Sequence, residues 1–190
     1  NTEMSFVANC ERKGYHYGLI VHGDEMLEDF MGYITSPLCV FVVRSFFHPA
    51  IHRATKISGC EGKVIYVRSG CTNTFWFASR PPWKSAKNLT WSFVGCPKAG
   101  REQALKVFSK MKGGFQLLTD EGFTPEEEKF TALKSTEYVD ILRRSIFTLC
   151  PMGWVNIDTN RVYEALDSGS IPVVIKNLSN GVIEDSYWDH

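Results

Sequence analysis

Short apolar runs separated by polar stretches follow one another along this chain, and their spacing changes near residue 88. The first three runs have the β-branched and aromatic content of strands, at 18–21, 39–46 and 63–67. Strand and helix patterns then alternate, with strands expected at 89–94, 115–118, 147–150 and 171–175 and helices at 101–111, 136–145 and after Asp158. This alternation predicts an α/β protein built on parallel, doubly wound sheets.

The segment from Phe147 to Ile175 is the clearest strand–loop–helix–strand unit. Pro151 ends the first strand, Asp158 is placed to cap the following helix, and Gly169 is placed to end it. The buried side of that helix is expected to carry Val162, Ala165 and Leu166. The β-branched run at 171–175 is typical of a strand covered on both faces. Ligands bind at such strand–helix loops, and a helix N-terminus there can hold a phosphate.

Two charged residues of this unit are suited to binding a ligand that contains a diphosphate and a ribose. Arg161 and Glu164 are three residues apart, so they project from one face of the expected helix. The helix dipole disfavours a cation in the first turn, which suits Arg161 if a diphosphate lies just beyond the helix end. Glu164 can then accept hydrogen bonds from ribose, while Gly153 allows close backbone approach. The alternative is an ion pair between Arg161 and Glu164, with Asp158 as a second local partner.

Other candidate chemistry is more limited. His22, Asp24 and Glu25 follow an expected strand, where one of them can act as general base toward an acceptor hydroxyl, or cap the loop. Cys150 has no nearby histidine or basic motif to activate its thiol, so packing at a strand end is favoured over a nucleophile. Neither a GxGxxG nor a Walker pattern occurs. The cysteines lack metal-ligand spacing, so no metal site is expected.

Charge and hydropathy restrict the partners and the compartment. The chain has 21 basic and 21 acidic residues, which gives no electrostatic case for binding nucleic acid. Its longest apolar run, at 37–43, is far shorter than the ~20 residues of a membrane span. Glycosylation sequons at Asn88 and Asn177 are compatible with a secretory lumen, where Cys60 and Cys71 can pair across a short strand.

Four segments, in order, resemble the exostosin-like (GT47-type) glycosyltransferases and their ribitol xylosyltransferase-like relatives. The strongest, Cys150 to Pro172, is similar to that group's CPRG followed by DTxRxYEALExGCIPV. The other three matches are Gly18–Glu25 for GLxHxxDE, Val43–Arg44 for VxRxxx, and Ser92–Arg101 for SFxGxxxxxR. Met152 departs from this pattern, because the group usually has arginine there, and Ser170 replaces a frequent cysteine.

The resemblance implies a GT-B-like fold with Rossmann-like parallel sheets in two facing domains, here truncated at both ends. Residues 1–80 would form the C-terminal part of the acceptor-side domain, 81–88 a linker that begins with two prolines, and 89–190 the incomplete nucleotide-sugar-binding domain. The implied reaction is inverting and metal-independent. It moves a sugar from a nucleotide diphosphate sugar, expected to be UDP-linked, to a glycan hydroxyl, with no separate cofactor.

The resemblance also assigns roles, partners and a location. Donor contacts are expected from Gly153, Asp158, Arg161 and Glu164, and the general base is expected to be Asp24 or Glu25. The expected location is the Golgi or another secretory-pathway lumen, with membrane anchoring through a segment outside this chain. A homo- or hetero-oligomer with a related glycosyltransferase fits the group. The alternatives are a non-catalytic pseudo-glycosyltransferase partner, suggested by Met152, and an unrelated Rossmann-like binding domain.

Overall fold

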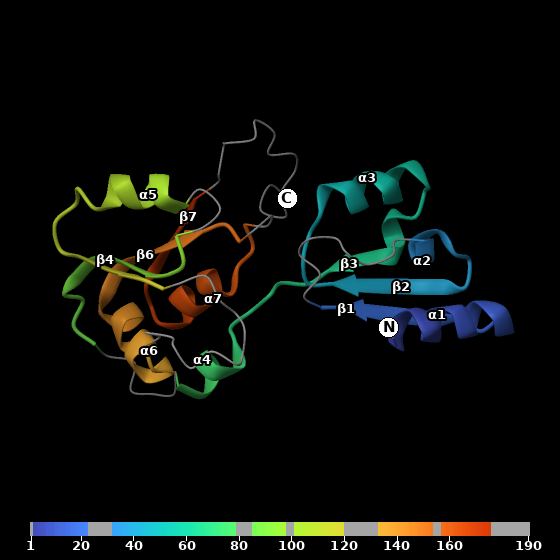
Figure 1. The fold of residues 1–190 in the computed structure, drawn as a ribbon, viewed down its shortest axis with the longest axis horizontal. Coiled ribbons are helices and arrows are strands. Elements are labelled where there is room, and N and C mark those ends of the chain that lie inside the picture. Colours follow the sequence, from blue (N-terminus) through green and yellow to red (C-terminus); the bar gives the residue numbers. More distant parts are fainter. Residues whose placement is uncertain are drawn as a thin grey trace. The chain divides into compact units, whose positions relative to one another are not determined.

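Two parallel sheets form the framework of the protein, one in each of two compact units (Figure 1). The computed structural model describes residues 2–22, 32–78, 85–97, 101–119, 133–153 and 157–175. The described residues up to Ser69 form the first unit, and those from Gly70 form the second. Parallel strands joined by helices confirm the α/β class and are compatible with Rossmann-like units.

The first unit contains a three-stranded sheet in the order β1-β2-β3. Its elements are α1 (Thr2–Lys13), β1 (Tyr17–Val21), α2 (Gly32–Thr35), β2 (Cys39–Arg44), α3 (Pro49–Ile57), the 3-10 helix η1 (Glu61–Lys63) and β3 (Val64–Tyr66). The three predicted strands are confirmed, whereas the helices were not predicted. Among the described residues of this unit, the core consists of Cys10, Tyr17, Tyr33, Ile34, Cys39, Val42 and Ile51.

The second unit contains a four-stranded parallel sheet in the order β5-β4-β6-β7. Its elements are α4 (Asn73–Ala78), β4 (Leu89–Gly95), α5 (Arg101–Phe108), β5 (Gly114–Leu118), α6 (Ser135–Arg144), β6 (Ser145–Pro151), α7 (Asn160–Asp167) and β7 (Ile171–Ile175). The chain runs outward from β4 to β5 and then returns to β6 on the other side of β4. The strand order therefore reverses between β4 and β6.

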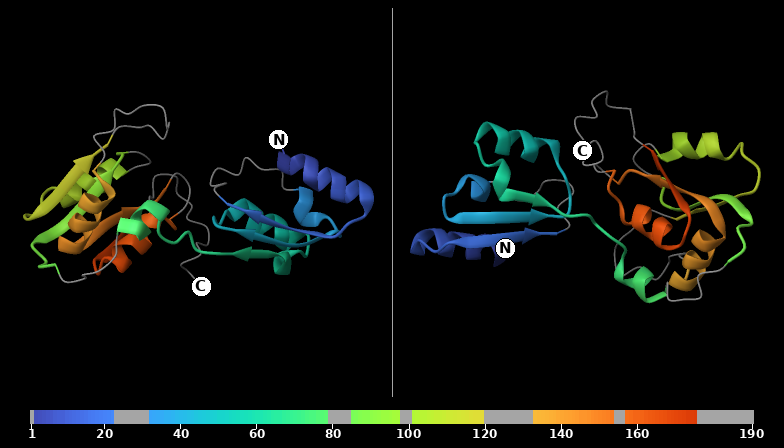
Figure 2. Two further views of the ribbon diagram at one scale, coloured as in Figure 1. Left: turned by 90° about the horizontal axis from the view of Figure 1, so that it is seen from below. Right: turned by 180° about the vertical axis from the view of Figure 1, so that it is seen from behind.

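Helices cover both faces of this second sheet (Figure 2). Leu105 of α5 packs on one face against Trp91, Phe93 and Leu149. Val162 and Ala165 of α7 pack on the other face against Cys150, the strand neighbour of Leu149. Helix α6 lies beside α7 and contacts α4. Because consecutive strand residues face opposite sides, the run Leu149–Cys150 serves both cores.

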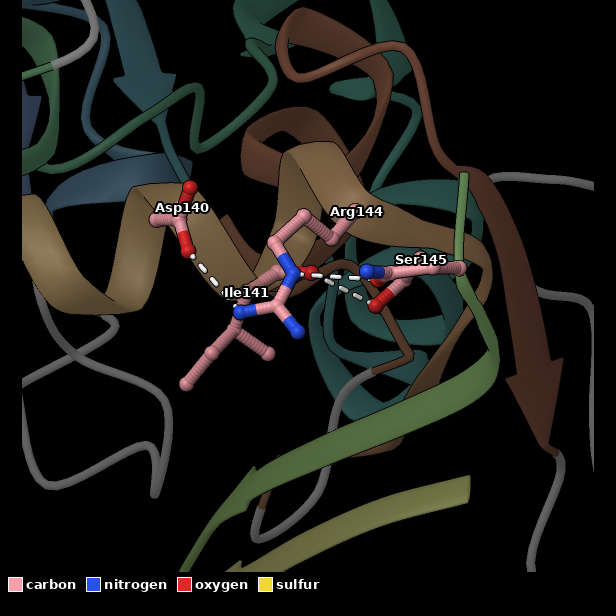
Figure 3. Close-up of polar contacts among 5 residues, drawn as sticks. Asp140, Ile141, Arg144 and Ser145 are labelled. Atoms are coloured by element: carbon pink, nitrogen blue, oxygen red, sulfur yellow. Dashed lines mark hydrogen bonds and ion pairs between the residues drawn. The ribbon is translucent and has the colours of Figure 1, made fainter. Parts of the chain in front are cut away.

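The junction of α6 and β6 has no loop, because the helix ends at Arg144 and the strand begins at Ser145. Figure 3 shows how side chains close this helix end. The Ser145 hydroxyl donates to the Ile141 carbonyl at 2.6 Å, and the Ser145 backbone N–H donates to Leu142. Arg144 pairs with Asp140 at 3.3 Å. The two bonds from Ser145 satisfy carbonyls that the last helical turn leaves unpaired.

The boundary between the units differs from the expected one. A linker at 81–88 was predicted, but the division lies between Ser69 and Gly70. The reason is Phe75 of α4, which is buried against Val139 and Leu142 of α6. The segment that reads as the end of the first domain therefore contributes to the core of the second.

Two burial predictions for the α7–β7 region are wrong. Leu166 is 56% exposed, because it lies away from the Val162–Ala165 side that faces the sheet. Ile171 is 55% exposed, because β7 is an edge strand in the described sheet. The helix end is as predicted, since Gly169 follows the last turn with φ of +67°, a conformation that glycine adopts without strain.

Candidate functional site

The carboxyl ends of β4 and β6 lie side by side where the strand order of the second sheet reverses. In open parallel sheets this switch point is the usual ligand-binding edge. Helix α5 follows β4 and α7 follows β6, so both helices begin at this edge. Each brings an arginine there, Arg101 as the first residue of α5 and Arg161 as the second residue of α7.

Arg101 connects the two loops of this edge. Its side chain is buried, and Nε and Nη2 both donate to the Met152 carbonyl, at 3.1 and 2.9 Å. Nη1 donates to the Cys96 carbonyl at 3.2 Å. The guanidinium therefore fixes the loop after β6 to the loop after β4. Sequence reasoning found Arg101 only as the end of a matched motif and assigned it no role.

Arg161 is held more lightly. Its Nη2 donates to the Val94 carbonyl at 3.1 Å, and its guanidinium carbon lies 5.2 Å from the centre of the Phe93 ring. Its Nε is buried and has no hydrogen-bond partner among the residues that the structure describes. Within the described ranges no ion pair joins Arg161 to Glu164 or Asp158, so the predicted alternative of a local ion pair is wrong.

Gly95 provides the space that Arg161 occupies. A Cβ built on Gly95 would lie 2.8 Å from Nη2 of Arg161. The backbone of Gly95 has φ of +147°, which other residues rarely adopt. Both the conformation and the space at the end of β4 therefore call for glycine.

Glu164 lies one turn deeper in α7 and is 5% exposed. Oε1 accepts from the Thr72 hydroxyl at 2.8 Å and from the Thr72 backbone N–H at 3.3 Å. Oε2 accepts from the Tyr138 hydroxyl at 2.9 Å. Burial and the nearby Glu164 charge raise the pKa of Tyr138. Glu164 thus joins α7 to α6 and to the segment before α4. This role could not be predicted from the sequence, because Thr72 is far from Glu164 along the chain.

The start of α7 is built differently from the expected capping arrangement. The N-cap residue is Thr159, not Asp158, and Thr159 makes no side-chain cap bond. Asp158 is buried, and its carboxylate accepts a hydrogen bond from the Tyr163 hydroxyl. Gly153, the last described residue of the preceding loop, is also buried and follows the Met152 carbonyl that Arg101 holds.

Cys150 fills the space beneath α7. Its side chain is fully buried against Val162 and Ala165, and burial raises the pKa of its thiol to about 12. A thiol that stays protonated is a poor nucleophile, which confirms the packing interpretation. All six cysteines are free, so Cys60 and Cys71 do not form the disulfide that the sequence allowed.

The corresponding edge of the first sheet carries His22, whose Nδ1 lies 2.7 Å from the Ser45 hydroxyl. The proposed bases Asp24 and Glu25 lie outside the described residues. Among the described residues no group of three histidine, cysteine or acidic side chains is arranged to hold a metal ion. None of the described helices combines the length and the apolar character that a membrane crossing requires.

Comparison with known families supports the resemblance seen in the sequence. The family model described as the RXYLT1 C-terminal domain matches residues 76–189, which is more than half of the chain. No individually curated protein matches it. The match includes Arg101, Arg161 and Glu164 and supports a ribitol xylosyltransferase-like relationship with a glycosyltransferase-related function. This chain belongs to the RXYLT1 C-terminal domain family.

Proposed function

We propose that this chain carries the donor site of a glycosyltransferase that moves a sugar from a UDP-linked nucleotide sugar to a glycan hydroxyl. The observation that carries the proposal is the placement of Arg161. Its guanidinium lies at the switch point of the second sheet, in the first turn of α7, with no carboxylate partner in the described ranges. The family match gives this position a glycosyltransferase context.

The electrostatics of the site favour a diphosphate. The partial positive charge at the start of α7 disfavours the nearby Arg161 cation unless an anion lies between or beside them. Among the described residues, Arg161 donates a single side-chain hydrogen bond, to a neutral carbonyl, which leaves its charge available to phosphate oxygens. A helix N-terminus and a guanidinium can together stabilise a leaving diphosphate, so the transfer we propose is metal-independent. That it is inverting and uses a GT-B arrangement is proposed from the family resemblance.

The other residues expected to bind the nucleotide sugar have secondary roles in this proposal. Gly153 lets the loop after β6 approach the diphosphate, and Asp158, through Tyr163, shapes the turn that precedes α7. A carboxylate offers about four acceptor positions, and three of those on Glu164 are occupied. We assign the remaining position on Oε2 to a ribose hydroxyl. The candidate bases from the sequence, Asp24 and Glu25, follow β1 of the first unit.

The biological setting that we propose follows the resemblance and the sequons. The protein would act in the Golgi lumen, anchored through a segment outside this chain, and pair with itself or a related glycosyltransferase. A second candidate is a non-catalytic partner that binds the donor without transferring sugar. Met152 favours it, because a side chain without charge stands in the loop where the group usually has arginine.

Binding of UDP and UDP-sugars to the full-length protein tests the proposal. We expect thermal stabilisation by UDP and by one UDP-sugar, with UDP-xylose the first tested. Arg161→Ala should weaken UDP binding by about 10- to 100-fold, the range for losing hydrogen bonds to a charged group. Arg144→Ala, which removes an exposed arginine of the same unit, is the matched control.

Two outcomes would contradict the proposal or select the second candidate. Equal UDP affinity in Arg161→Ala and wild type, with lowered thermal stability in the variant, would make Arg161 a structural residue and would overturn the donor site. UDP-sugar binding without release of UDP in the presence of glycan acceptors would identify a non-catalytic partner.

A further inference from the structure

The sequon at Asn88 lies on the described surface of the second unit, directly before the amino end of β4. We infer that Asn88 carries an N-linked glycan, attached at the edge of the second sheet opposite to the proposed donor site. The inference rests on the secretory location that we propose together with the function. It depends on the orientation of the Asn88 amide, on the packing of its neighbours and on its place in the sheet. The other sequon, at Asn177, lies outside the described residues.

The amide of Asn88 is oriented by Arg144, the last residue of α6. Asn88 is exposed, and its Oδ1 accepts a hydrogen bond from Arg144 Nε at 3.0 Å. A guanidinium has donors and no acceptor, so the amide oxygen faces Arg144 and Nδ2 faces away. Asp140 pairs with the same guanidinium at 3.3 Å, which restricts its position (Figure 3). None of the described residues hydrogen-bonds Nδ2, so the atom that receives a glycan is directed to solvent.

The residues on both sides of Asn88 attach it to the junction of α6 and β6. Lys87 Nζ donates to the Ser145 carbonyl at 2.9 Å, and Leu89 pairs with Ser145 in the sheet. The backbone at Asn88 is therefore fixed from both sides. A large polar group on Nδ2 extends from this backbone into solvent without displacing packed side chains.

The third residue of the sequon, Thr90, is packed against Gly113 in the folded protein. The Thr90 backbone N–H donates to the Gly113 carbonyl at 2.7 Å, and a Cβ built on Gly113 would lie 2.6 Å from Thr90 Oγ1. Gly113 directly precedes β5, the strand that pairs with β4. The modifying enzyme recognises the threonine together with the asparagine, so it must act before β4 pairs with β5. The glycan is therefore added to the chain before this sheet is complete.

The covalent step balances on the Asn88 amide and one co-reactant, a lipid-linked oligosaccharide diphosphate of the secretory pathway. A bond forms between Nδ2 and the anomeric carbon of the first sugar. The bond between that carbon and the diphosphate oxygen breaks, and its electron pair leaves with the lipid diphosphate. Nδ2 loses one hydrogen as a proton and keeps the other. Oδ1 is unchanged, so the hydrogen bond from Arg144 remains after the modification.

The attachment point is remote from the proposed donor site within the second sheet. Strand β4 has seven residues, so its two ends are about 20 Å apart. Asn88 precedes the amino end of this strand, whereas Arg161 bonds to Val94 near its carboxyl end. A glycan on Asn88 therefore begins at the opposite edge from Arg161, and binding of the nucleotide should not depend on it.

The glycosylation state of the full-length protein, produced in animal cells, tests the inference. Peptide N-glycosidase converts a glycosylated asparagine to aspartate, so in heavy-oxygen water the peptide that contains Asn88 should gain labelled oxygen, measured by mass spectrometry. Asn88→Asp, which keeps an acceptor for Arg144, should remove one glycan from the intact protein. Thr90→Val should remove the same glycan, whereas Thr90→Ser, which keeps a hydroxyl, should retain it. All three variants should bind UDP with the affinity of the wild type.

A control variant shows whether the chain meets the glycosylation enzymes. Lys56 is exposed near the end of α3 in the first unit, and Lys56→Asn places an asparagine two residues before Ser58. This single change creates an exposed sequon outside the second unit. The variant should gain one additional glycan and keep the glycan on Asn88.

The outcomes separate the inference from the proposed function. An unmodified Asn88 in a protein whose Lys56→Asn variant gains a glycan would overturn the inference. Absence of a glycan from both positions would overturn it together with the secretory location, whereas UDP binding would still decide the donor site. Weakened UDP binding by Asn88→Asp would contradict the separation of the glycan from that site and would overturn this part of the inference.

Discussion

The first and second turns of α7 each carry a charged side chain, and the protein holds the two in different ways. Glu164, in the second turn, accepts three hydrogen bonds from Thr72 and Tyr138 and is almost completely buried. Arg161, in the first turn, donates one bond to a backbone carbonyl and keeps a buried Nε without a partner. The two residues are three positions apart and do not pair.

The hydrogen bonds of Glu164 show that its charge stabilises the fold, whereas the charge of Arg161 remains available to a ligand. Buried polar groups in folded proteins are normally hydrogen-bonded, so Glu164 has a structural part besides the ribose contact proposed for it, whereas Arg161 does not. An arginine with unused donors at a ligand-binding edge is therefore the better indicator of a binding site. By the same reasoning, Arg101 has a structural role despite its position, because its donors hold the Met152 and Cys96 carbonyls.

The largest expected effect on stability comes from removing the Glu164 carboxylate. Glu164→Ala leaves the buried Tyr138 hydroxyl and the Thr72 donors without their acceptor, and each unsatisfied group costs about 1–3 kcal/mol. We expect the free energy of unfolding to fall by about 2–4 kcal/mol in urea titrations. Asp140→Ala, which removes an exposed carboxylate from α6, is the control. A stability loss no larger than that of the control, with strongly weakened UDP binding, would make Glu164 a ligand residue alone.

The pattern of apolar residues was sufficient to predict the strands of both sheets. Every predicted strand is present, because parallel strands have continuous β-branched runs that short helices lack. The boundary between units could not be predicted in the same way. Phe75 reads as part of an aromatic cluster near a proline-rich stretch, and only its contacts with Val139 and Leu142 place it in the second unit.

The sequence predicted only those parts of the candidate site that are formed by residues close together along the chain. Arg161 and its position in α7 followed from local spacing, but the partners of Glu164 did not, since Thr72 lies on a distant segment. Asp158 was expected to cap α7, yet its carboxylate bonds to Tyr163. The contact between His22 and Ser45 depends on the register of β1 and β2, which no local pattern specifies.

Alkaline pH tests the packing of Cys150 beneath the same helix. Burial raises the pKa of this thiol to about 12, whereas an unfolded cysteine has a pKa of about 8.5. The unfolded state therefore releases the proton first, and folding loses stability as pH rises above the unfolded value. Between pH 8 and 10 the loss attributable to Cys150 should be about 2 kcal/mol. Urea unfolding of Cys150→Ala should show a correspondingly smaller pH dependence, and an unchanged slope would contradict the burial argument.

Gly95→Ala tests the position of the Arg161 guanidinium without changing the arginine. The added methyl group would lie 2.8 Å from Nη2, so the guanidinium must move away from the Val94 carbonyl. We expect UDP affinity to fall by about 10-fold, close to the effect of losing one hydrogen bond to a charged group. Gly169→Ala is the matched control, because Gly169 also has positive φ but has open space around it. Equal effects of the two variants on UDP affinity would mean that backbone strain alone is responsible.

The smallest effect on stability should come from replacing Ser92. This residue allows the same comparison between hydrogen-bonded and unbonded polar groups to be made inside the sheet. Ser92 is completely buried on β4, and its hydroxyl has no hydrogen-bond partner within the described part of the chain. On the neighbouring strand the Thr148 hydroxyl is 2.7 Å from the Ser170 hydroxyl, and both are buried. Removing an unsatisfied hydroxyl relieves a desolvation cost, whereas removing one member of a bonded pair creates that cost. Ser92→Ala should therefore leave the free energy of unfolding unchanged or raise it by up to about 1 kcal/mol, while Ser170→Ala lowers it by about 1–2 kcal/mol. If the Ser92 variant were the less stable of the two, its hydroxyl would have to make a bond that the described residues do not provide.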